Sequence, residues 1–137
     1  MGKTKLLILV ALTFLSSGAR ATEADPAAYQ EVTQAELAGA PEAFQDKKVR
    51  FTGTFLFTGS DFCYQIRKTK INTKDYFCFA LGTPSVVRLY LKKDHPQADE
   101  LLNVKKGARV TAFGVFDFLG ADYKFLVVDR IEVKPAP

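Results

Sequence analysis

Apolar and polar residues alternate along most of the chain beyond residue 48. The stretch 49–57, VRFTGTFLF, directs Phe55 and Phe57 to one face and Thr52 and Thr54 to the other. A period of two is typical of a strand with one buried face. The pattern therefore predicts a domain built mainly of β-strands. The same alternation recurs in five later stretches: 62–67, 75–81, 86–93, 108–118 and 123–133.

A short helical region precedes the first strand. Thr33 can cap a helix, and Glu36 stands three residues later, where it completes a capping box. Gly and Pro residues that follow make a long helix unfavourable. We therefore predict two short helices, over 34–38 and 41–45, with Leu37 and Phe44 packed on the strands.

The stretch 94–102, DHPQADELL, predicts one helix between two strands. Asp94 can serve as its N-cap, and Pro96 suits the first turn because its missing N–H costs little there. Gln97 then occupies the reciprocal position of a capping box. A Lys-Lys-Gly sequence ends the helix before the chain returns to strand.

The resulting order is three strands, a helix and two strands, if 49–67 forms one bent strand. That is the order of the OB-fold, a five-stranded Greek-key barrel. The stretches KKVRFTGTF, KKGARVTAFGVF and YKFLVVDRIEV resemble secreted bacterial OB-fold proteins, including the group similar to anticodon-binding domains. The resemblance covers about residues 33–133. It implies an all-β barrel with one helix between strands 3 and 4 and an N-terminal helical segment, and it carries over no functional residue.

The first residues, MGKTKLLILVALTFLSSGARA, have the features of an export signal. Lys3 and Lys5 precede an apolar run of ten residues, and small residues flank Arg20, as at a signal-peptidase site. Ten residues span about 15 Å as a helix, half of a bilayer core. We therefore expect no transmembrane span in the mature chain.

This pattern predicts three parts of the chain. They are a signal peptide over 1–21, a flexible N-terminal segment over 22–31 and a single OB-like barrel domain over 32–134. Cleavage near Ala21 would leave a protein that is periplasmic or secreted.

Charge is distributed unevenly along the mature chain. Removal of the signal leaves 16 basic and 15 acidic residues, so the net charge does not indicate nucleic-acid binding. Residues 22–46 carry six acids and no base, whereas 47–93 carry ten bases and two acids. The positive charge is thus concentrated in one third of the chain.

The two cysteines, Cys63 and Cys78, frame a basic loop. If they lie opposite each other in a hairpin, Phe77 and Phe79 share one face while Tyr76 and Cys78 share the other. Export favours a disulfide between them, worth about 3 kcal/mol for a loop of ~15 residues. The alternative is two buried free thiols that act as small apolar side chains.

The face of the second and third strands is the usual ligand surface of an OB-fold. Aromatic rings between positive charges suit the binding of an extended polymer, although outward Lys, Arg and Tyr are also ordinary on exposed strands. The candidate ligand residues are Arg67, Lys68, Lys70, Lys74, Tyr76, Arg88, Tyr90 and Lys92.

We expect no cofactor, no metal site and no catalytic residue. His95, the single histidine, stands beside the expected cap and is interpreted as a solvated neighbour of it. Asp117 and Asp122 flank the last turn without the oxygen spacing of a calcium loop. An enzyme would need a nucleophile with a positioned base or paired carboxylates, and no such motif occurs.

Two binding hypotheses follow. The first is an exported, non-catalytic module that engages a protein or peptide of the cell envelope through the strand 2–3 face, with exposed Leu126 and Val128 contributing. The alternative is polyanion binding, of single-stranded nucleic acid or an acidic oligosaccharide, through the basic hairpin 67–74. Nucleic acid is the less favoured partner, because an exported protein seldom meets it. The sequence does not indicate an oligomeric state.

Overall fold

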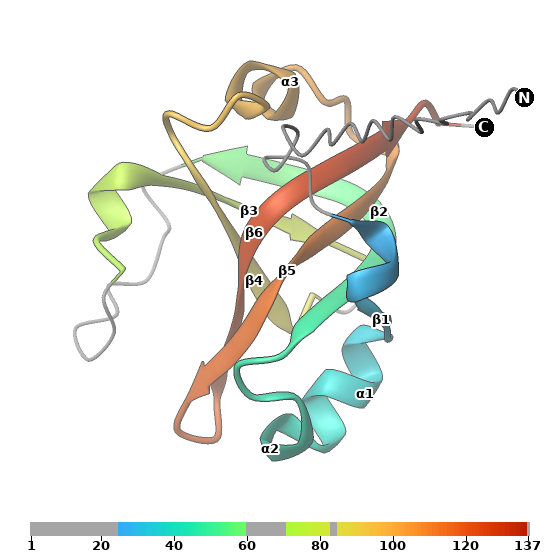
Figure 1. Ribbon diagram of the computed structural model, residues 1–137. Helices are drawn as coiled ribbons and strands as arrows, with labels where there is room; N and C mark the ends of the chain where they lie inside the picture. Colours follow the sequence, from blue (N-terminus) through green and yellow to red (C-terminus); the bar gives the residue numbers. More distant parts are fainter. Residues whose placement is uncertain (1–24, 60–70, 83–84, 137) are drawn as a thin grey trace, which may run out of the picture.

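The computed structural model describes residues 25–59, 71–82 and 85–136. Within them the chain forms a mostly β domain with a few short helices (Figure 1). The strands are β1 (Gln30–Glu31), β2 (Lys48–Gly59), β3 (Tyr76–Leu81), β4 (Val87–Lys92), β5 (Arg109–Leu119) and β6 (Tyr123–Lys134). The helices are α1 (Gln34–Gly39), α2 (Pro41–Phe44) and α3 (Ala98–Leu102), with 3-10 turns η2 (Pro26–Ala28) and η3 (Thr73–Asp75).

Strands β2 to β6 close into a five-stranded barrel. Their order is β2-β3-β4-β6-β5, and β5 pairs again with β2 to complete the ring. The β4–β6 pairing is parallel, and the other pairings within the ring are antiparallel. This is the OB-fold with its helix between the third and fourth barrel strands, as predicted. The expected fold class is confirmed.

The core lies inside the barrel and follows the predicted alternation. Along β2, residues at alternate positions from Val49 to Phe55 are buried. The prediction fails at Phe57, whose side chain is 45 % exposed. The pairing of β2 with β3 shifts between Phe55 and Phe57. A shift of one residue moves a side chain to the other face of a strand.

Short helices close both ends of the barrel. α3 lies across one end, and α1 with α2 lies at the opposite end (Figure 1). Leu101 of α3 and Leu37 of α1 are both fully buried in the same core, with Phe44 packed against it. The predicted capping box is present, because Thr33 Oγ1 accepts from the Glu36 N–H and Glu36 Oε1 accepts from the Thr33 N–H.

The predicted start of the second helical region is wrong. Residues 93–97 form turns, and α3 begins at Ala98 with Gln97 as its N-cap, so Asp94 does not cap it. The Gln97 amide bonds the backbone of β6 instead, which anchors α3 on the barrel.

The segment before α1 contains regular structure in its described part. The described part of 22–31, from Asp25 on, contains η2 and β1, and β1 pairs in parallel with the start of β2. Tyr29 is only 4 % exposed, and its ring lies edge-on to Phe113 with the centroids 5.4 Å apart. Burial of this ring explains why the segment is ordered against the barrel.

Candidate functional site

The outer surface of β3 and β4 is the predicted ligand face, and the structure confirms which residues it holds on β3. Phe79 lies in the barrel core with Phe77 packed against it, while Tyr76 and Cys78 lie on the opposite side. The predicted register is wrong, however, because Cys78 stands opposite Gly59 on β2 and opposite Tyr90 on β4. The expected register came from placing Cys63 opposite Cys78, whereas β3 pairs with an earlier part of β2.

The centre of this face is an apolar cluster. Cys78, Tyr90 and Phe125 are buried there, with Tyr76 and Tyr123 packed at its margin. The Tyr90 ring meets Tyr76 and Phe125 edge-on, at centroid distances of 6.1 and 6.0 Å. Tyr123 stacks on Phe125 at 5.8 Å, and its hydroxyl is hydrogen-bonded to that of Tyr90. The face is thus a second small core outside the barrel.

Two expectations of exposure are therefore wrong. Tyr90 is fully buried and offers no ring to a ligand in this conformation. Leu126 and Val128 are also buried, at 0 % and 5 % exposure, because they belong to the barrel core. The shift in register between β5 and β6 explains the error, because it leaves Asp129 as an extra residue and puts Leu126 and Val128 on the same inward face as Ile131.

The remaining candidates divide by position. Lys74 and Lys92 are exposed, and Tyr76 and Arg88 are half-buried at the border of the cluster. The other three, Arg67, Lys68 and Lys70, lie outside the described residues, as does Cys63. The Cys63–Cys78 disulfide thus stays a prediction.

Sequence reasoning missed an exposed apolar patch beside Arg88. We define the Phe57–Arg88 patch as Phe57, Val86 and Arg88. The Arg88 guanidinium lies over the Phe57 ring, with its Cζ 5.9 Å from the centroid. Val86 is 36 % exposed and borders the same hollow as Arg88, Tyr123 and Lys124, about 360 Å³ in volume. The sequence pattern did not predict that Phe57 is exposed, because only the bulge in β2 turns its side chain outward.

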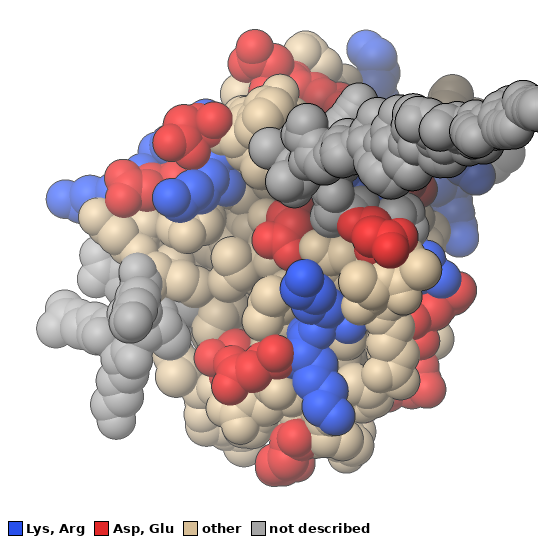
Figure 2. All heavy atoms as spheres, in the orientation of Figure 1, with Lys and Arg blue, Asp and Glu red and all other residues tan. Residues whose placement is uncertain are grey.

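Among the described residues near this face, basic side chains lie beside acidic ones. Lys92 and Lys93 share a hollow with Asp75 and Asp94. Acidic and basic side chains are also interspersed on the side of the barrel where β5 and β6 lie in front, as Figure 2 shows. Mixed charge of this kind gives a weaker attraction for a polyanion than a continuous basic stripe would.

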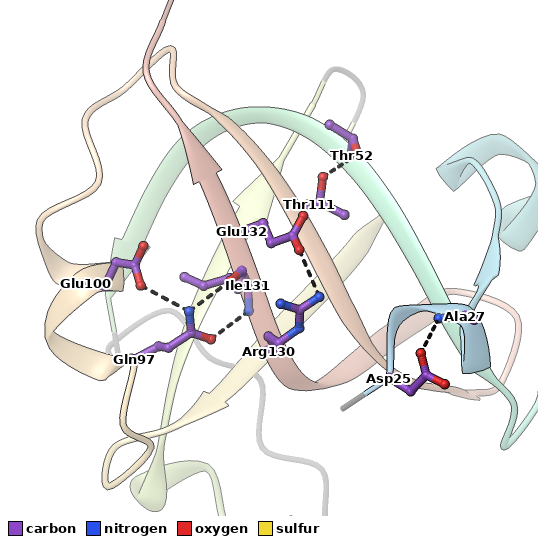
Figure 3. A network of polar contacts seen from close by, with 9 residues as sticks. All are labelled: Asp25, Ala27, Thr52, Gln97, Glu100, Thr111, Arg130, Ile131 and Glu132. Carbon is purple, nitrogen blue, oxygen red and sulfur yellow. Dashed lines mark hydrogen bonds and ion pairs between the residues drawn. The ribbon is translucent and has the colours of Figure 1, made fainter. Parts of the chain in front are cut away.

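His95 has a structural role rather than that of a solvated cap neighbour. Its Nδ1 accepts from the Gln97 N–H at 2.9 Å, so Nε2 carries the proton and donates to the Asp129 carbonyl oxygen at 2.7 Å. Gln97 then pairs its side-chain amide with both backbone groups of Ile131, at 2.8 Å each (Figure 3). These bonds attach the approach to α3 to β6 and leave His95 no free ring nitrogen for catalysis.

The pKa of Tyr29 is clearly shifted from its ordinary value. Its hydroxyl donates to Asp129 Oδ2 at 2.8 Å. Burial raises the pKa of Tyr29 to about 12, and the hydrogen bond and charge of Asp129 add to the effect while Arg130 opposes it. A raised tyrosine pKa disfavours the phenolate, so this group is a structural tie rather than a base.

The described residues offer no group of three or more His, Cys, Asp or Glu side chains that could hold a metal ion. In the same part of the chain, no helix has the length and apolar character needed to cross a membrane.

No protein-family model matches the chain. No curated protein matches it either. Solved structures do match in fold. The asparaginyl-tRNA synthetase of Pyrococcus horikoshii superposes with a TM-score of 0.55 and 15 % identity, over 77 % of this chain and 23 % of that one.

A protein of Leishmania major described as an aspartyl-tRNA synthetase gives a TM-score of 0.57 at 12 % identity, over 89 % of this chain and 23 % of that one. The Stn1–Ten1 complex of S. pombe gives 0.47 at 12 % identity, over 63 % and 57 %. The chain spans less than two thirds of each of these chains. The likeness to the two synthetase structures shows the OB-fold and carries no function with it.

Proposed function

We propose that the protein is an exported, non-catalytic OB-fold binding module that engages a protein or peptide through the outer surface of β3 and β4. One observation carries the choice of partner. The described residues expose three large apolar side chains, and two of them, Phe57 and Val86, lie in the Phe57–Arg88 patch. Aromatic residues and arginine are enriched where proteins bind one another.

The burial of Tyr90 also favours a protein or peptide partner over a single-stranded nucleic acid. Binding of single strands by stacking needs exposed rings along a positive groove. Here the central ring is covered, and the exposed lysines stand beside Asp75 and Asp94. The apolar patch, rather than a basic stacking platform, is therefore the stronger basis for recognition.

Export rests on the sequence of residues 1–21. A basic start, an apolar run of ten residues and small residues before Thr22 support it. Expression with residues 1–21 in place, followed by mass measurement of the processed protein in cell fractions, tests it. Recovery of the unprocessed chain from the cytoplasm would overturn this part of the proposal.

The binding proposal is tested by cross-linking in envelope extracts with the mature protein and its Phe57→Asp variant. We expect a partner that the variant loses, since a charge in a buried apolar contact is strongly unfavourable. The matched control is Leu102→Asp, because Leu102 is 48 % exposed but lies on α3 at the far end of the barrel. Equal capture by the wild type and Phe57→Asp would contradict the assignment of the patch.

Polyanion binding is the alternative, supported by exposed Lys74, Lys92 and Lys93. Its test uses heparin and a single-stranded oligothymidine as probes. Binding by counterion release falls steeply with salt, whereas apolar docking survives about 0.5 M NaCl, where the screening length is only a few ångströms. Tight, salt-sensitive binding of either probe that Phe57→Asp leaves unchanged would favour the alternative.

A further inference from the structure

A larger hollow lies between β1, α1, β2 and the end of β3, and Ala38 and Val86 border both it and the hollow beside Arg88. The larger hollow has a volume of about 690 Å³, within the range of small-ligand sites. It is bordered mainly by small and apolar residues together with the middle of β2. The residues that matter below are Glu31, Gln34, Ala35, Ala38, Thr52 and Gly82.

On the side away from β5, the backbone of β2 has no partner strand at this point within the described residues. Pairing with β1 ends at Arg50, whose carbonyl oxygen accepts from the Val32 N–H at 3.0 Å. Pairing with β3 begins at Phe55, and the Thr54 carbonyl oxygen accepts from the Gly82 N–H at 2.8 Å. Thr52 lies between these two attachments, where the described parts of β1 and β3 do not reach.

The direction of the Thr52 backbone groups follows from the pairing of β2 with β5. Phe55 bonds to Ala108 and Gly107 on the β5 side. Backbone groups alternate in direction along an antiparallel strand, so Thr52 faces Thr111 as a non-hydrogen-bonded pair. Its N–H and carbonyl oxygen therefore point away from β5, toward the hollow.

The polar side chains around the hollow already have partners. The Gln34 amide donates to the Leu81 carbonyl oxygen at 2.7 Å, and its oxygen accepts from the Val86 and Val87 N–H groups at 3.1 Å each. Thr52 Oγ1 is bonded to Thr111 Oγ1 at 2.7 Å. Recognition here thus depends on a backbone donor and acceptor between small apolar walls, which suits a peptide amide better than a sugar or phosphate.

An amide already pairs with an open strand edge elsewhere in the molecule. At the outer edge of β6, the Gln97 amide satisfies both the N–H and the carbonyl oxygen of Ile131. One amide is therefore enough to complete a strand position that has no neighbouring strand. Thr52 presents the corresponding pair of groups to the hollow.

The charge of the residues around the hollow favours a cationic peptide. Residues 25–46, which form β1, α1 and α2, contain five acidic residues and no Lys or Arg. Glu31 borders the hollow, and its side chain remains 78 % exposed beside Arg50. A cationic ligand would gain from this acidic surrounding, whereas an acidic one would be repelled.

We propose that the hollow between α1 and β2 binds an extended cationic peptide, which pairs one backbone amide with Thr52 and places a small apolar side chain against Ala35 and Ala38. The hollow shares Val86 with the Phe57–Arg88 patch but is not bordered by Phe57 or Arg88. Its test depends on Thr52 and Ala35, so it can fail without contradicting the proposed function.

The test uses the mature protein and an acetylated, amidated Lys-Val-Lys-Val-Lys-Val hexapeptide, followed by ¹⁵N amide shifts. We expect saturable shifts at Thr52, Gly53 and Gly82. The Glu-Val counterpart should bind at least about tenfold more weakly. N-methylation of the central amides should abolish binding, because it removes the donor that pairs with Thr52.

A filled-site variant keeps the test specific. Ala35→Leu places extra volume in the hollow on an exposed helical position, and Ala43→Leu is the control on α2, which does not border it. We expect Ala35→Leu to weaken binding by about tenfold or more and Ala43→Leu to leave it unchanged. The proposal is overturned if no saturable binding occurs, if the N-methylated peptide binds as well, or if both variants bind equally.

Discussion

The hydroxyl of Tyr29 donates a hydrogen bond of 2.8 Å to Asp129 Oδ2, 100 positions further along the chain. This contact joins the segment before β1 to β6 on the far side of β5. Arg130, the next residue of β6, lies with its guanidinium 4.3 Å from the centroid of the Phe113 ring, against which Tyr29 packs. The N-terminal segment is thereby part of the folded unit.

This tie predicts a loss of stability at high pH. The pKa of Tyr29 is raised to about 12 in the folded state, above the value of about 10 for an unfolded chain. The stabilisation is therefore complete below pH ~10 and is lost as the pH rises through ~12. Urea denaturation of the wild type and Tyr29→Phe should show a difference of about 1 kcal/mol at neutral pH that shrinks over this window. A constant difference up to pH ~12 would contradict it.

Removal of the Gln97 side-chain amide should lower the free energy of unfolding substantially. Gln97→Ala leaves the N–H and carbonyl oxygen of Ile131 without their partner in a partly buried position. We expect a loss of about 2 kcal/mol in the free energy of unfolding. Gln45→Ala is the control, because Gln45 makes one exposed bond to Asp117 and should cost less than ~0.5 kcal/mol. Chemical denaturation of both variants measures the difference.

Gly114 should tolerate no side chain. A Cβ there would lie 2.1 Å from the Val127 carbonyl oxygen, at the shift in register between β5 and β6. We expect Gly114→Ala to cost more than ~3 kcal/mol or to prevent folding. Gly39→Ala is the control, since a Cβ meets nothing within 4 Å at the end of α1, and alanine is the better helix former. Similar melting temperatures for the two variants would be inconsistent with this close approach.

Adjacent leucines on α3 should behave very differently. Leu101 is fully buried at the end of the barrel, whereas Leu102 is 48 % exposed. Leu101→Ala should lower the free energy of unfolding by about 2–5 kcal/mol through lost burial and a cavity. Leu102→Ala should change it by less than ~0.5 kcal/mol. Equal effects in thermal denaturation would mean that α3 does not close the barrel.

The predicted Cys63–Cys78 disulfide has a direct chemical test. Cys78 is fully buried, so its resistance to alkylation in the folded protein would not distinguish a bridge from a buried thiol. Alkylation in denaturant without reductant should leave both cysteines unmodified in the mass spectrum of the exported protein. Two alkylated cysteines under these conditions would show that the bridge is absent.

Local pattern was sufficient for most of the secondary structure. Alternation located the strands because one face of each faces the barrel interior. The Thr33–Glu36 capping box located α1, since such a cap depends on neighbours within four residues. The order of these elements indicated the OB-fold, and the barrel confirms it.

The errors all involve contacts between distant segments. The bulge after Phe55 turns Phe57 outward, and β3 pairs with an earlier part of β2 than expected, so Gly59 lies opposite Cys78. The shift in register between β5 and β6 turns Leu126 inward, and apolar packing on the outer side of the barrel buries Tyr90. The preference of Gln97 for the edge of β6 moves the start of α3 away from Asp94.

The amino-acid sequence by itself therefore determined which segments are strands and helices, because those preferences arise from residues close together in the chain. Only the tertiary structure decided which side chains remain exposed around Arg88. It also decided that β2 has no described partner strand at Thr52 on the side away from β5. Exposure and open backbone edges depend on which strands finally lie side by side, and alternation along one strand carries no information about the strand beside it.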